Sequence, residues 1–258
     1  MKEEKLPSKT RRLLPIIVLF LVVALWWALS ALHVYPESAF PSPQSVIKGF
    51  GEEIKAGRLF DDLIASLFRV LTGFALAVAL GIPLGLILGQ RARARAALLP
   101  TVNFFRNLSP LAWIPFAILW FGIGDKPAIF LIFMASFFPM VLATIAAVAS
   151  IPAVYFRVAQ NYGYRGAELL KQVTLPAIVP QVITSLRITA GLAWVVVVAA
   201  EMIAGQDGLG FAIWDSRNGL RIDLLVVNMI VIGIIGVVID RLLLLLTRIP
   251  SIRWGYER

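Results

Sequence analysis

The chain has 258 residues, of which 59% are hydrophobic, and it carries a net charge of +9 and no cysteine. A soluble domain averages about 45–50% apolar residues, so this excess indicates a lipid environment. The missing cysteines exclude disulfides and thiolate metal sites, and the basic residues form no aromatic-interleaved stripe of the kind that binds nucleic acid.

Six apolar runs each come near the roughly 20 residues that a helix needs to cross a bilayer. They are residues 13–32, 63–89, 108–124, 127–150, 182–204 and 224–246. Backbone groups in lipid must be paired within their own segment, and the runs do not alternate as barrel strands do. The sequence therefore predicts an all-α polytopic membrane protein, with one domain over residues 1–258 and no soluble appendage.

The first run follows the basic N-terminal segment 1–12 and has a hydrophobic core of twenty residues. A signal peptide has a shorter core, of about 7–15 residues, before a small-residue cleavage site. We expect a retained spanning helix. Removal as a signal peptide is the alternative, because Ala28-Leu29-Ser30 is similar to a cleavage site.

An outer segment and two structural signals come next along the chain. After the breaker Pro41-Ser-Pro43, four apolar residues at helical spacing predict a short amphipathic helix on the outer surface: Val46, Ile47, Phe50 and Ile54. In the second run, Gly81 and Gly85 allow another helix to approach closely, within one subunit or between two. In the third run, Pro110 and Pro115 are expected to kink the helix.

A polar insert, residues 151–177, separates the fourth and fifth runs. Ile151-Pro152 is expected to open a helix, Asn161-Tyr162-Gly163 to end it, and Gly166 to begin a second. Leu175-Pro176 is expected to stop the insert. Leu169, Leu170 and Val173 could dock on a soluble partner, with Arg165 and Lys171 at the rim. An ordinary amphipathic loop is the alternative.

Lysine and arginine fix the expected orientation. Residues 1–12, 90–107, 151–177 and 241–258 hold sixteen of them, against six in the other segments between the runs. Both termini and the insert are therefore predicted to be cytoplasmic.

The insert resembles the EAA loop of ABC importer permeases. That pattern is Glu-Ala-Ala, three residues, Gly, nine residues, Ile, any residue, Leu-Pro. Gly163, Leu175 and Pro176 match it, Val173 replaces the Ile, and Arg157-Val158-Ala159 stands where Glu-Ala-Ala is usual.

The resemblance covers nearly the whole chain and is to the nitrate, sulfonate, taurine and bicarbonate branch. It rests on six further stretches: Pro41-Ser-Pro43, Ala65–Phe74, Gly81-Ile-Pro-Leu-Gly85, Ile118–Gly124, Gly191–Val195 and Ala199–Met202. It implies a type I importer subunit in the cytoplasmic membrane of a bacterium or archaeon. Its partners would be a second permease copy, two ATPase subunits and an extracytoplasmic binding protein. The implied ATPase-coupling residues are Arg157, Ala159, Gly163, Tyr164, Arg165, Gly166, Glu168, Leu169, Leu175 and Pro176.

The chain has no Gly-x-x-x-x-Gly-Lys-Ser/Thr phosphate loop and no catalytic constellation. ATP and Mg²⁺ are therefore expected on the partner ATPase, and no cofactor on this chain. The only histidine, His33, is expected at an outer helix end. A self-contained secondary transporter or channel is the alternative, and it would need its own ion-coupling site. A membrane enzyme is disfavoured, because no catalytic cluster is present.

Ionisable groups at membrane depth are candidates for a translocation path. Arg187 and Glu201 share a helix face about 21 Å apart, together with Trp194. Pairing of Arg187 with Asp240, and of Arg69 with Glu201, is the structural alternative. Ser136 and Asn228 are further pore-lining candidates. The outer segment 214–218 could face a docking protein, or be a solvated loop.

Overall fold

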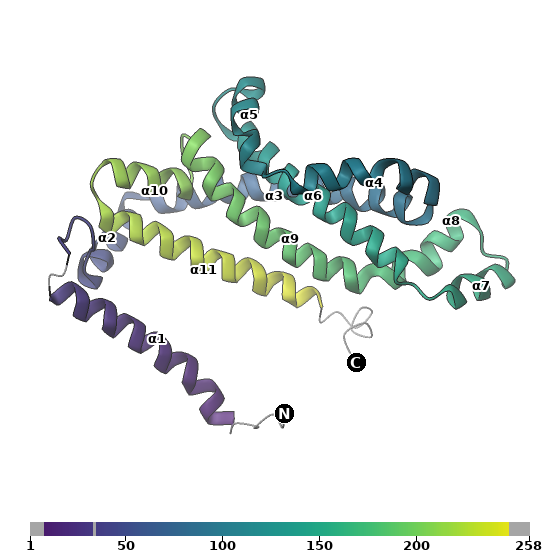
Figure 1. The fold of residues 1–258 in the computed structure, drawn as a ribbon. Helices are drawn as coiled ribbons and strands as arrows, with labels where there is room; N and C mark the ends of the chain where they lie inside the picture. The colour runs from purple at the N-terminus through teal and green to yellow at the C-terminus, as the bar shows by residue number, and fades with distance from the viewer. Residues whose placement is uncertain (1–7, 33–34, 248–258) are drawn as a thin grey trace. The chain divides into compact units, whose positions relative to one another are not determined.

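The computed structural model describes residues 8–32 and 35–247, and every regular element among them is helical (Figure 1). The all-α prediction is thus confirmed. The side chains of segment 1–12, His33 and residues 248–258 lie outside the described part. In chain order the elements are α1 (Ser8–Ala31), α2 (Pro43–Ala56), α3 (Arg58–Gln90), α4 (Ala92–Asn107), the 3₁₀ turn η1 (Pro110–Trp113), α5 (Ile114–Phe121), α6 (Asp125–Ala149), α7 (Ala153–Asn161), α8 (Gly166–Leu169), the π turn η2 (Leu170–Thr174), α9 (Leu175–Ala204), α10 (Leu209–Asn218) and α11 (Ile222–Leu246).

Five stretches of the described chain are long and apolar enough to cross a membrane. They are Leu13–Ala31, Arg58–Gln90, Asp125–Ala149, Gly166–Ala204 and Ile222–Leu246. Five of the six predicted runs fall on these stretches.

The predicted span 108–124 stays a prediction, and the segment does not form one long helix. The apolar helix there covers only Pro110–Phe121, and a stretch of this length rises about 18 Å, short of a hydrocarbon core of about 30 Å. The two prolines do not kink one helix, because each stands in the first turn of a new one, Pro110 in η1 and Pro115 in α5. The chain before them forms α4, which the apolar pattern did not reveal.

Two compact units divide the chain, and the prediction of one domain over 1–258 stays a prediction. The first unit comprises residues up to Phe60 together with Ala212–Ile230. In it α2 confirms the predicted short helix: the Ser42 side chain accepts the Ser45 N–H at 3.2 Å, Pro43 opens the first turn, and Gly57 closes the helix. Its apolar residues are divided, with Val46 buried and Ile47, Phe50 and Ile54 exposed.

The second unit, Asp61–Phe211 and residues from Val231 onward, contains most of the membrane helices. In it α6 and α9 lie side by side (Figure 1). Glycines let α3 approach α6: a Cβ added at Gly85 would lie 2.5 Å from Cβ of Thr144, and one added at Gly89 would lie 2.8 Å from Cβ of Val148. Packing of the glycine face within one subunit, one of the two sequence alternatives, is what the structure has.

Candidate functional site

The polar insert begins with a short helix that ends at a glycine. Pro152 precedes α7, and three hydrogen bonds close its last turn: Tyr162 N–H to Val158 O at 3.1 Å, Gly163 N–H to Gln160 O at 3.0 Å, and Tyr164 N–H to Ala159 O at 3.0 Å. Gly163 has φ +86°. This is a Schellman closure, in which the residue after the cap is left-handed. The predicted end of the first helix is confirmed.

The sequence predicts that the insert stops at Leu175-Pro176. The structure differs, because the helix continues through these residues. Gly166, with φ +52°, starts α8 as expected, but α8, η2 and α9 then form one apolar helical stretch from Gly166 to Ala204. The Leu175 N–H bonds to Leu170 O, five residues back, and Leu175 keeps helical dihedrals directly before Pro176. The wide π turn accommodates Pro176, which would otherwise interrupt the backbone hydrogen bonds of the helix. The insert is therefore continuous with a membrane helix.

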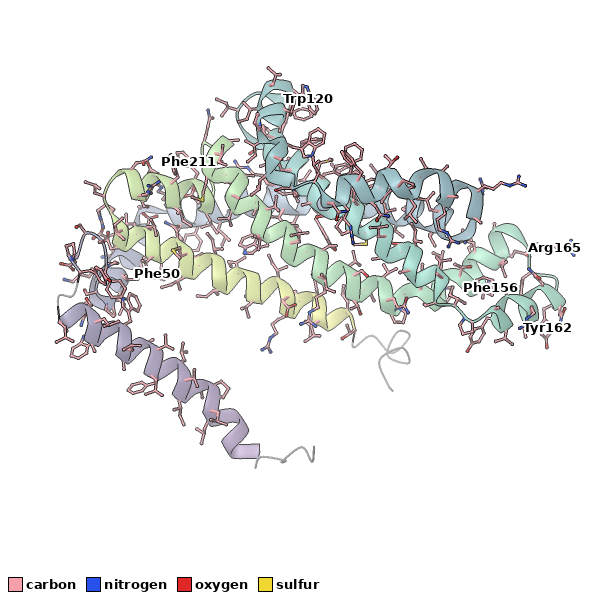
Figure 2. All side chains as sticks on the ribbon, in the orientation of Figure 1. Phe50, Trp120, Phe156, Tyr162, Arg165 and Phe211 are labelled. Carbon is pink, nitrogen blue, oxygen red and sulfur yellow. The ribbon has the colours of Figure 1, made fainter. Side chains whose placement is uncertain are left out.

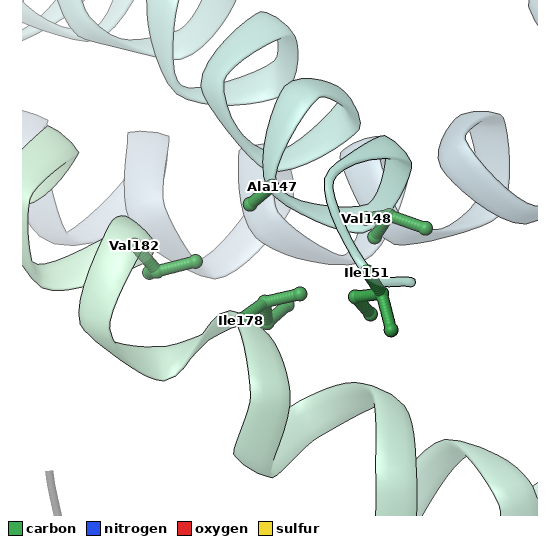
Figure 3. Packing of buried hydrophobic residues seen from close by; sticks show 5 residues of the cluster. All are labelled: Ala147, Val148, Ile151, Ile178 and Val182. Carbon is green, nitrogen blue, oxygen red and sulfur yellow. The ribbon is translucent and has the colours of Figure 1, made fainter. Parts of the chain in front are cut away.

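A small apolar core fixes the base of the insert. Figure 3 shows Ala147, Val148 and Ile151, from the end of α6 and the linker after it, packed with Ile178 and Val182 of α9. Phe156 of α7 packs against this cluster. Beside it, the Ser150 hydroxyl donates to the Gln181 side chain at 3.0 Å. The insert is thus attached to α6 and α9 at once, and a displacement of α7 has two membrane helices to act on.

An open groove of about 1130 Å³ runs along the insert. Its walls come from α7, the turn after it, η2 and the first turns of α9, and they include Val154, Tyr155, Val158, Tyr162, Tyr164 and Val173. Tyr162 is 80% exposed and Tyr155 58% exposed. Figure 2 shows Tyr162 and Arg165 at the end of the hairpin made by α7 and α8. An exposed apolar surface of this kind marks an interaction site.

The predicted coupling residues fall on different parts of this insert. Ala159 is buried, Leu169 and Leu175 are partly buried, and Gly163, Gly166 and Pro176 shape the backbone. The charged residues Arg157, Arg165 and Glu168 are exposed. Sequence reasoning missed Tyr155 and Tyr162 as groove residues, although their helical spacing from Val154 and Val158 places all four on one side of α7.

The ionisable residues at membrane depth are paired. The Arg69 side chain, 2% exposed, lies 2.8 Å from Glu201, which is 0% exposed, so the pairing proposed as the structural alternative is confirmed. Arg69 also bonds to Asp125 at 2.7 Å, to the Asp207 carbonyl at 2.9 Å and to the Asp207 carboxylate. Glu201 accepts from the Ser66 hydroxyl at 2.9 Å and from the Gly210 N–H at 3.0 Å. This network joins α3, the start of α6, the end of α9 and the loop before α10.

A second ion pair joins α9 to α11. Arg187 donates to both carboxylate oxygens of Asp240, at 2.5 and 2.8 Å, as the structural alternative predicted. Nearby, the Trp194 ring nitrogen donates to the Ile232 carbonyl at 3.0 Å, and the ring lies against Gly236. Arg187 and Trp194 therefore lie where α9 packs on α11.

The remaining path candidates, Ser136 and Asn228, are buried. Ser136 is 0% exposed and Asn228 is 1% exposed. Each has one buried oxygen without a hydrogen-bond partner in the described part of the chain, Oγ of Ser136 and Oδ1 of Asn228. The assignment of all five residues to a translocation path stays a prediction.

A family model described as "Binding-protein-dependent transport system inner membrane component" matches residues 81–250. A putative ABC transporter permease protein of Methanocaldococcus jannaschii is 37% identical over 83% of this chain and 82% of its own length. The taurine transport system permease protein of Escherichia coli is 33% identical over 91% and 87%. The bicarbonate transport system permease protein of Synechococcus elongatus is 37% identical over 74% and 69%.

Among solved structures, an inward-facing MetNI methionine ABC transporter superimposes with a TM-score of 0.59 over 74% of this chain and 97% of that chain. The sequence identity is 20%, so this similarity speaks for the fold.

Proposed function

The chain belongs to the family of binding-protein-dependent transport system inner membrane components, and we propose that it forms the membrane path of an ATP-driven importer for a small anion. The chain is a multi-pass permease subunit of an ABC importer, a transport component rather than an enzyme.

The insert is the observation that carries the proposal. It presents an open, aromatic-lined groove at the end of a hairpin, and its base is packed into α6 and α9. An ATPase subunit bound there would move two membrane helices as it closes. Coupling of this kind needs an element that passes nucleotide-driven motion on without bending, and the capped turn and the continuous helix through η2 supply that stiffness.

An anionic substrate is supported by the names of two relatives, permeases for taurine and for bicarbonate. Both molecules carry a negatively charged group at neutral pH. Nitrate and alkanesulfonates belong to the same proposed class, on the resemblance of the sequence motifs.

The proposed assembly follows from this function. Two copies of the chain would enclose the path, two ATPase subunits holding ATP and Mg²⁺ would bind the inserts, and an extracytoplasmic binding protein would deliver the anion. The insert and both termini would then be cytoplasmic, in the cytoplasmic membrane of a bacterium or archaeon, as the distribution of lysine and arginine favours.

Reconstitution into proteoliposomes tests the proposal. Labelled taurine, bicarbonate, nitrate and an alkanesulfonate are offered with the binding protein on one side of the membrane, and with ATP and an ATPase subunit of the same genome on the other. We expect uptake of one of these anions that needs ATP, the ATPase and the binding protein together. Uptake that proceeds without ATP would instead establish a self-contained secondary transporter or channel.

A further inference from the structure

The charged residues of the insert are mostly basic, and they form no ion pair with the part of the chain that the structure describes. Between residues 153 and 176 there are three basic side chains, Arg157, Arg165 and Lys171, and one acidic side chain, Glu168. All four are exposed. None forms an ion pair within residues 8–32 and 35–247, whereas Arg58, Arg69, Arg187 and Arg221 all do.

These charges lie on the same insert as the groove, and none of the four lines it. On α7, Arg157 comes one residue before Val158 and therefore lies about 100° around the helix from it. Tyr164 and Gln172 line the groove. Arg165 directly follows Tyr164 in the sequence, and Lys171 directly precedes Gln172. The insert therefore combines an apolar groove with two exposed positive charges in excess outside the groove.

We infer that the ATPase face that binds this insert is apolar at its centre and acidic at its edge, with carboxylates opposite Arg157, Arg165 and Lys171. This inference rests on the proposed function. Charges at the rim of an interface select partners and speed association, because like charges brought together are costly. Arg157 stands at the position where the EAA pattern has glutamate, so an ATPase with a basic group opposite that position would meet a like charge.

An anionic lipid surface is the competing source of negative charge. The groove favours a protein. A lipid surface attracts basic residues without a concave site, whereas the insert has a groove of about 1130 Å³.

Binding measurements with charge variants test the inference. The probe is the purified ATPase subunit that restores uptake in the proteoliposome assay, titrated onto the detergent-purified permease. We expect Arg157→Glu, Arg165→Glu and Lys171→Glu each to raise Kd about tenfold, and Glu168→Lys to lower it. The wild-type Kd rises about tenfold as salt increases from about 0.05 to 0.5 M, because the Debye length shortens. Arg93→Glu, an exposed charge on α4, is the matched control and leaves Kd unchanged.

The opposite effect of Glu168→Lys separates charge from misfolding, since a disrupted insert cannot bind more tightly. Lysine substitutions of carboxylates on the ATPase should restore binding to Arg157→Glu. If wild-type binding is tight but indifferent to salt and to all four reversals, the acidic rim is refuted while the proposed function stands. If the reversals alter uptake only in vesicles containing phosphatidylglycerol, with Kd for the ATPase unchanged, lipid is the partner and the inference fails. If no ATPase restores uptake by the wild type, the proposed function itself fails.

Discussion

Gly163 is the residue on which the shape of the insert depends most directly. Its φ of +86° is open to glycine and strained for other residues, while a Cβ added there would meet nothing within 4 Å. The cost of a side chain is therefore one of backbone conformation alone, about 1–2 kcal/mol for an L-residue in the left-handed region.

We predict that Gly163→Ala weakens ATPase binding about 5–30-fold, because the closed hairpin becomes less populated by that free energy. Titration of the ATPase onto the purified variant measures it. Gly51→Ala is the control: Gly51 lies within α2, a Cβ there also meets nothing within 4 Å, and its φ is outside the left-handed region. Equal affinities for the two variants would contradict the role given to the turn.

Arg69 tests the buried network. Replacing it by leucine leaves Glu201 without its cation in a site that is 0% exposed, and breaking a buried pair on one side costs about 3–5 kcal/mol. Thermal unfolding in detergent should show a large loss of stability for Arg69→Leu. The loss of stability should be small for Arg221→Leu. Arg221 pairs with Glu52 and Asp223, but its side chain is 47% exposed, and exposed pairs contribute about 0–1 kcal/mol.

The double variant Arg69→Leu, Glu201→Leu should recover part of that loss, because no buried charge then lacks a partner, although the Ser66 hydroxyl and the Gly210 N–H lose their acceptor. A double variant as unstable as Arg69→Leu would show that the arginine stabilises the fold by some route other than Glu201.

The contact of α3 with α6 is the feature to test at the scale of elements. A Cβ at Gly85 would lie 2.5 Å from Cβ of Thr144 and 2.8 Å from the Val141 carbonyl oxygen, so the helices must separate. We predict that Gly85→Ala lowers the free energy of unfolding by about 1–3 kcal/mol, as overpacking does. Gly233→Ala on α11, where a Cβ meets nothing within 4 Å, should be neutral. Unchanged unfolding of Gly85→Ala would refute the close approach.

Two neighbouring aromatic residues of α7 allow ATPase binding to be tested separately from the transmission of motion to the membrane helices. Tyr155 lines the groove, whereas Phe156 packs against the core at the base of α6 and α9. We predict that Tyr155→Ala weakens ATPase binding, while Phe156→Ala leaves it intact but lowers the anion transported per ATP hydrolysed. Parallel assays of Kd, hydrolysis and uptake make the distinction. A Phe156→Ala variant with normal uptake per ATP would show that this contact does not transmit motion.

How far the sequence predicts the elements depends on what interrupts each one. Long apolar runs without a break, such as those of α6 and α11, were placed to within a few residues, because hydropathy and length suffice for them. The stretch around Pro110 is expected to be one kinked helix and instead forms two short ones, because apolar composition does not show where a proline starts a new helix. The continuation of the insert through Pro176 is not predicted, because it depends on a π turn. No local sequence pattern indicates such a turn.

At the site, the sequence predicts what is local and misses what depends on packing. The turn at Gly163 and the second helix from Gly166 follow from short-range rules. The attachment of Phe156 to the core of α6 and α9 needed tertiary contacts. The pairs Arg69–Glu201 and Arg187–Asp240 were predicted as alternatives, since ionisable groups at membrane depth rarely lack partners.

For the whole molecule, we propose that the insert lies in the cytoplasm and binds the ATPase, so that a separate motor protein drives this permease. The family establishes the class of importer. The groove and its attachment to α6 and α9 give the insert a way to pass motion into the membrane helices.

Photocrosslinking tests that claim most directly. A benzophenone amino acid placed at Tyr162, 80% exposed at the end of the insert, is irradiated in the assembled complex of permease, ATPase and binding protein, with Trp214 of α10 as the comparison position. We predict that position 162 crosslinks to the ATPase and that position 214 does not. A crosslink from position 162 to the binding protein, on the other side of the membrane, would contradict it.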